Sequence, residues 1–242
     1  MIYARSSKIS QEAILLNYGS PFGFIFKDKN WLKKFAVASL LTYTLIGAAP
    51  IFGWTIEIVR RVGQGEEPAI PELKDWRLFW KLGGKFALVN AIWLLPLLLS
   101  VILIYLPLIF ANSIKPELML AVFGGTLCCV MSFLFVYIIV YVFFFPAMMV
   151  VLAKGGSVWK AVNPIQLGKM IHPRFSEYFL VFLIVGVALI NIILLLSTLS
   201  LFLFLPPMLV YAGLVTAHYA GQLLRLNVET ITTEVTGNKE NS

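Results

Sequence analysis

Four long blocks of apolar residues dominate the chain and limit what it can fold into. They cover residues 35–59, 86–113, 118–153 and 178–224, and Glu57 is the one Asp, Glu, Lys or Arg in any of them. A helix that crosses the hydrocarbon core of a bilayer needs about 20 apolar residues. The second block fits one such helix, and the fourth is long enough for two with a tight turn near Ser200. The sequence therefore predicts an all-α protein, a polytopic transmembrane helix bundle of four to six spans.

Composition and charge agree with a membrane protein. Of the 242 residues, 60% are hydrophobic and only 13% are charged, about half the charged share of a soluble protein. The net charge of +7 comes from cations that flank the apolar blocks, which is typical of membrane topology and of contact with anionic lipid headgroups. The predicted partners are therefore the lipid bilayer, anionic headgroups and other membrane proteins. Nucleic acid is not predicted, because no basic stripe lies on a soluble fold.

The placement of the cations bears on how the first block is folded. If residues 35–59 cross the membrane once, one of the two basic flanks must lie outside, against the positive-inside tendency. If the block turns back on itself, every one of the 19 Lys and Arg residues except Lys115 lies on one side, and both termini are cytoplasmic. The block is too short for two full spans, so such a hairpin would be shallow or re-entrant. A single kinked span is the alternative.

A faint repeat favours the hairpin. Three prolines each begin an apolar stretch that ends at a glycine, and proline suits the first turn of a helix. Each outgoing helix also follows an amphipathic segment. This pattern predicts three helical hairpins, each led by an interfacial helix. The three stretches run from Pro50 to Gly63, from Pro146 to Gly155 and from Pro206 to Gly221.

The clearest amphipathic segment covers residues 72–81. Its aromatic residues recur at helical spacing on one face and its cations lie on the other, as in a helix at the headgroup layer. A connecting helix on the membrane surface is one interpretation, and a partner-docking face is the other. The docking residues would be Trp76, Phe79, Trp80, Arg77 and Lys81.

Two weaker segments resemble it, residues 10–16 and residues 157–171, the second interrupted by Pro164. We expect a single transmembrane domain over residues 1–228, of which 1–34 form an amphipathic entry segment. Residues 229–242 are predicted to be a polar, loose C-terminal tail.

Few residues in the apolar blocks offer chemistry. Glu57 precedes Arg60 and Arg61 by three and four residues, so it can pair with either on one helix face at the headgroup level. A coupling-ion carboxylate is the alternative for Glu57. His218 could hold a pigment or haem, but a hydrogen-bonded packing residue is favoured, and no metal site is predicted. The sequence contains no phosphate-binding, nucleophile-elbow or zinc-protease motif, which disfavours an enzyme.

Residues 50–82 carry a family resemblance. A helix ending in Trp54-Thr55-Ile56-Glu57-Ile58-Val59-Arg60-Arg61-Val62 is followed by a Gly-Glu turn and by Ile70-Pro71-Glu72-Leu73-Lys74-Asp75-Trp76. With the entry segment Phe26-Lys27-Asp28-Lys29-Asn30-Trp31, this resembles a prokaryotic membrane-protein family, domain of unknown function four-zero-one-three. Ile70 replaces the family's usual leucine, and Lys74 stands where an acid is common. The resemblance implies a bacterial or archaeal multi-pass protein and supplies no activity.

Three functions remain open at this level. The leading hypothesis is a non-enzymatic accessory or scaffold subunit of a larger membrane complex in a prokaryotic cell membrane or an internal, for example photosynthetic, membrane. The first alternative is a transporter or channel component for a small solute or lipid. The second is a subunit that binds a pigment or haem through His218.

Overall fold

The chain folds into α-helices that pair as hairpins. The computed structural model describes residues 16–66, 70–109, 115–200 and 202–240, and no strand occurs among these residues. A short α2 (Ser20–Gly23) and a 3-10 turn η1 (Phe24–Lys27) lead into the first hairpin. This arrangement confirms the predicted all-α helical bundle.

Residues 35–59 turn back on themselves. They form the end of α3 (Trp31–Thr42) and most of α4 (Leu45–Gln64). Between the two helices Thr44 is in extended conformation, and its hydroxyl accepts a hydrogen bond from the amide of Gly47 at 3.0 Å. This is an N-cap, which stabilises the start of a new helix. The single kinked span is therefore not the structure of this block.

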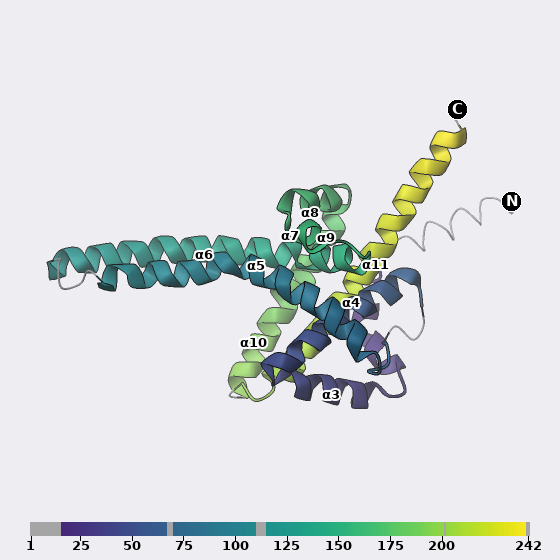
Figure 1. Cartoon of the computed structure of the whole chain (residues 1–242), viewed down its shortest axis with the longest axis horizontal. Helices are drawn as coiled ribbons and strands as arrows, with labels where there is room; N and C mark the ends of the chain where they lie inside the picture. The colour runs from purple at the N-terminus through teal and green to yellow at the C-terminus, as the bar shows by residue number, and fades with distance from the viewer. Residues whose placement is uncertain (1–15, 67–69, 110–114, 201, 241–242) are drawn as a thin grey trace.

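The second hairpin is the longest. It consists of α5 (Trp76–Ile109) and α6 (Pro116–Ala153), which run side by side as an arm that projects from the rest of the molecule (Figure 1). Both helices continue through internal prolines, which are Pro96, Pro107 and Pro146. Most apolar side chains along the projecting part are exposed, as expected of surfaces that face lipid.

The third hairpin begins with two short helices and ends with a long one. The two short helices are α7 (Val158–Val162) and α8 (Pro164–Ile171), and the predicted interruption at Pro164 is the start of α8. Next come η3 (His172–Arg174), α9 (Phe175–Val181), the π-helix η4 (Phe182–Leu189) and α10 (Ile190–Leu199), and then α11 (Leu205–Glu240) returns. The hydroxyl of Tyr43 donates to the carbonyl of Leu203 at 2.6 Å, so the turns of the first and third hairpins meet.

The core lies where the three proline-led stretches pack together. α4 packs against α5 and α11, and α6 reaches both α4 and α11 with its C-terminal end. Each of the three stretches contributes side chains with no exposed surface, which are Ile58, Val59, Ala147, Met148, Val150, Leu214, Val215 and Ala217. The repeat thus marks the segments that build the core. Pro50 and Pro146 lie inside their helices, whereas Pro206 lies in the first turn of α11.

Three helical segments in the described part are long and apolar enough to cross a membrane. They are Trp76–Pro107, Glu117–Ala153 and Pro164–Leu199. They are compatible with integration into a membrane. The total of four to six spans stays a prediction, because α4 and α11 are shorter in apolar length and more deeply buried in the protein.

Two sequence expectations differ from the structure. Residues 72–81 do not form a separate interfacial helix, because residues 73 and 74 form a turn and Trp76 is already the first residue of α5. Residues 229–240 of the predicted loose tail continue α11, which projects away from the body (Figure 1), and residues 241 and 242 lie outside the described residues. The weaker segment 10–16 lies outside the described residues except for Leu16, which is buried.

Candidate functional site: an apolar cavity between the hairpins

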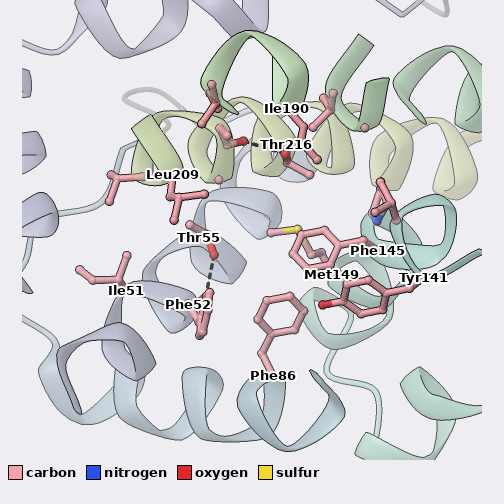
Figure 2. A pocket seen from close by; sticks show the side chains of 18 of the residues that line it. Ile51, Phe52, Thr55, Phe86, Tyr141, Phe145, Met149, Ile190, Leu209 and Thr216 are labelled. Atoms are coloured by element: carbon pink, nitrogen blue, oxygen red, sulfur yellow. Dashed lines mark hydrogen bonds between the residues drawn. The ribbon is translucent and has the colours of Figure 1, made fainter. Parts of the chain in front are cut away.

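A cavity of about 400 Å³ that could hold a ligand lies at the junction of the hairpins. Pockets of roughly 300–1,000 Å³ commonly bind small molecules in proteins. Helices α4, α5 and α6 form one side, and η4, α10 and α11 form the other (Figure 2). All three hairpins therefore contribute to a single site.

The first wall of the cavity is aromatic. Phe86 of α5 lies at its centre, with ring centroids 5.5 Å from Phe52 of α4 and 5.4 Å from Phe145 of α6. The ring of Tyr141 lies 5.9 Å from that of Phe145. Aromatic pairs prefer edge-to-face contacts of this kind, so the four rings form one continuous wall.

The few polar side chains that line the cavity are already hydrogen-bonded within the protein. The hydroxyls of Thr55 and Thr216 donate to carbonyls of their own helices at 2.8 and 2.7 Å. Thr42 bonds to its own helix in the same way, and the Tyr141 hydroxyl donates to the side-chain carbonyl of Asn90. No charged residue is among the described residues that line the cavity. A ligand inside therefore meets hydrocarbon and aromatic surface.

Asn90 links two helices, because its side-chain carbonyl on α5 accepts a hydrogen bond from the Tyr141 hydroxyl on α6. A second link is the hydrogen bond from the Tyr137 hydroxyl to the carbonyl of Trp93. Asn191 and Thr216 instead bond to carbonyls four residues earlier in their own helices, an arrangement open to short polar side chains.

Glu57, Arg60 and Arg61 form a cluster at the end of α4. The Glu57 side chain is only 2% exposed. Arg60 binds it with two nitrogens at 2.6 and 2.9 Å, and Arg61 approaches to 3.4 Å. A bidentate arginine–carboxylate pair is among the stronger polar contacts. The structure thus places Glu57 in an ion pair on one helix face.

A second ion cluster joins distant parts of the chain. The Lys34 ammonium lies 2.7 Å from Asp28 and 3.1 Å from Glu72, and it donates to the carbonyl of Ile70 at 3.3 Å. Asp28 and Lys34 are 8% and 5% exposed. Burial raises the pKa of Asp28, but hydrogen bonds from Lys34 and the Asn30 amide outweigh it and hold that pKa below its ordinary value.

This cluster and Trp54 explain what the two segments that carry the family resemblance, residues 26–31 and 70–76, do in the fold. Asp28 belongs to the entry segment, while Ile70 and Glu72 belong to the segment before α5. The indole nitrogen of Trp54 donates to the carbonyl of Pro71 at 3.1 Å, which fixes the second segment against α4. Sequence spacing alone missed this contact set, because its members lie far apart in the chain.

His218 lies on α11 beside η1. Its ring centroid is 4.5 Å from that of Phe24, and its Nδ1 lies 3.1 Å from the side-chain nitrogen of Gln222. These two neighbours occupy one ring face and one ring nitrogen. The arrangement fits a hydrogen-bonded packing residue. A pigment or haem would have to displace Phe24 or use the remaining ring nitrogen.

The five predicted docking residues are divided by the structure. Phe79 is 1% exposed and packs into the body, so it is not part of a docking face. Trp76 and Trp80 are 37% and 45% exposed, and Arg77 and Lys81 are exposed beside them. The reason is that α5 packs against α4 at this point, which buries the side that bears Phe79.

No group of three or more His, Cys, Asp or Glu side chains suited to a metal ion occurs among the residues that the structure describes. Comparison with known proteins gives one match. Residues 36–221 match the model of a family described as protein of unknown function (DUF4013). The chain belongs to this family. No curated protein and no solved structure matches the chain. The matched region contains the cavity, the Glu57 cluster and most of the three hairpins, so these features lie within the family's domain.

Proposed function

We propose that this chain is a non-enzymatic integral membrane protein that binds an apolar ligand taken from the membrane. The observation that carries the proposal is the cavity, which all three hairpins build and in which every polar side chain has a protein partner. A lipid-handling role is the form of the transporter hypothesis that agrees best with this surface, because a solute path needs polar lining groups.

The orientation is part of the same proposal. Lys and Arg residues flank α5 at its start and lie between α6 and α9, whereas Lys115 alone stands at the far turn of the second hairpin. The positive-inside tendency supports a cytoplasmic location for both termini. A prokaryotic cell membrane or internal membrane is the proposed location.

A larger side chain that occupies the cavity should prevent the ligand from binding. Gly213 lines the cavity, and a Cβ built there meets only Thr55 Cγ2 at 3.8 Å, an ordinary contact. Gly213→Leu therefore projects a side chain into the cavity from a helical position. Protein purified in mild detergent is extracted and its apolar small molecules are quantified by mass spectrometry. We expect the amount of apolar ligand in the wild type to exceed the amount in Gly213→Leu by one molecule per protein chain.

The matched control is Gly125→Leu. Gly125 lies on α6, and a Cβ there has no neighbour within 4 Å. The control should retain the same amount of ligand as wild type. Equal retention by wild type and Gly213→Leu would count against the proposed function.

An accessory subunit of a membrane complex is the second candidate, supported by the exposed Trp76 and Trp80 with Arg77 and Lys81. Tryptophan and arginine are enriched where binding energy is concentrated in protein interfaces. If a stoichiometric membrane partner is isolated with the wild type, Trp80→Ala should release it. Trp159→Ala, at a tryptophan that is 75% exposed on α7, should not. Retention of the partner by both variants rules out docking through this face.

A further inference from the structure

We propose that the cavity holds one acyl chain of a bilayer lipid, which enters tail-first between the first and third hairpins and leaves its headgroup outside. This inference rests on the proposed function and names its ligand. It follows from where the cavity opens, where it ends and which helix forms its second wall.

The mouth of the cavity lies on surface that faces lipid. Three lining residues are exposed, Phe52 at 38%, Leu194 at 51% and Leu209 at 49%, and they come from α4, α10 and α11. Leu194 belongs to the apolar stretch Pro164–Leu199, which is fit to cross a membrane. The α5–α6 arm and α10 run in different directions from the body (Figure 1). Because hydrocarbon surrounds such helices in a bilayer, lipid chains have direct access to the mouth.

The residues that line the inner part of the cavity are buried. Met149 is 1% exposed, and Thr55 and Thr216 are 5% and 4% exposed. Figure 2 shows Met149 beside the ring of Phe145, with Thr55 and Thr216 on neighbouring helices. Neither threonine hydroxyl has a free hydrogen, since each donates to its own helix. The end of a hydrocarbon chain fits this place, and a charged headgroup does not.

The wall opposite the aromatic side includes the π-helix η4. Phe182, Val185 and Gly186 of this segment line the cavity, and a Cβ at Gly186 would come within 2.6 Å of Val142 on α6. Short π-helical segments occur frequently at functional sites. Gly186 thus allows η4 to lie directly against α6 beside the cavity, and the π-helical geometry is an independent indication that this wall takes part in binding.

The test uses photoreactive lipid with the full-length chain reconstituted in phosphatidylcholine vesicles. One probe carries a diazirine at the end of one acyl chain, and a second carries it in the headgroup. Labelled residues are identified by mass spectrometry. We expect the chain-end probe to label Met149, which lipid at the outer surface of the protein does not reach. Leu120 on the arm is 74% exposed and serves as an internal standard for surface lipid.

Gly213→Leu should abolish labelling of Met149 and leave labelling of Leu120 unchanged. Gly213→Ala adds only a methyl group and serves as a milder variant, with reduced labelling expected. Absence of Met149 labelling in wild type with normal labelling of Leu120 overturns the inference, and so does equal labelling of Met149 by the headgroup probe. If extraction still finds another apolar molecule that Gly213→Leu loses, the proposed function stands while the acyl chain is excluded.

Discussion

Lys34→Met is expected to destabilise the protein by about 3–5 kcal/mol, the cost of removing one partner of a buried ion pair. The substitution leaves Asp28 as a buried carboxylate with the Asn30 amide as its remaining hydrogen-bond donor. It also removes the donor to the Ile70 carbonyl. Because this cluster ties the segment before α3 to the segment before α5, its loss should loosen both. Unfolding in mixed micelles with increasing dodecyl sulfate measures the effect.

Lys33→Met is the matched control, because the neighbouring Lys33 is exposed and no ion pair of it is recorded among the described residues. It should change the free energy of unfolding little. The double variant Asp28→Asn, Lys34→Met removes both buried charges and should recover part of the lost stability. Equal stability of Lys34→Met and Lys33→Met would show that the cluster contributes nothing.

The fold could be predicted to the extent that it depends on local signals. Apolar length and charge placement indicated hairpins, and the structure has them. The turn after Thr42 also has a local origin, since Thr44 caps the helix that follows. The role of the three prolines was only partly visible. They introduce the stretches that form the core, but Pro146 does not end a helix.

The incorrect predictions come from elements that tertiary packing decides. The segment before the second hairpin shows helical periodicity, yet Pro71 is held by Trp54 and Glu72 by Lys34, so the helix starts only at Trp76. The amphipathic pattern was correct in spacing, but Phe79 lies on the side that contacts α4. The tail has a different origin, because polarity after Val228 suggested a loose segment, whereas the residues up to Glu240 continue the helical geometry of α11 away from the body (Figure 1).

The candidate site was the least predictable part. The pairing of Glu57 with Arg60 follows from helical spacing, and the structure shows it. The cavity has no such signal, because a site for hydrocarbon needs no titratable group and its walls come from eight helical elements that are spread over the chain. Small residues such as Gly186 and Gly213 were the available hints, and glycine in apolar helices has many other uses.

Gly83→Ala is expected to destabilise the protein by about 3 kcal/mol, near the upper end of the usual cost of overpacking a core. At this point α4 and α5 are in backbone contact. A Cβ on Gly83 would overlap the carbonyl oxygen of Ala49, and a Cβ on Gly53 would overlap that of Phe79. Backbone atoms in two helices cannot move aside as a flexible side chain does, so the helices must separate.

Gly84→Ala should have the opposite effect. Gly84 is exposed, and a Cβ there has no neighbour within 4 Å. Alanine is a better helix former than glycine by about 1 kcal/mol, so this variant should equal or exceed wild type in the same unfolding experiment. The comparison separates helix propensity from helix contact, since both changes occur in one helix at adjacent positions.

Because α4 and α5 together carry the aromatic wall of Phe52 and Phe86, Gly83→Ala should also reduce ligand retention. A Gly83→Ala protein as stable as Gly84→Ala would mean that α4 and α5 are not in backbone contact.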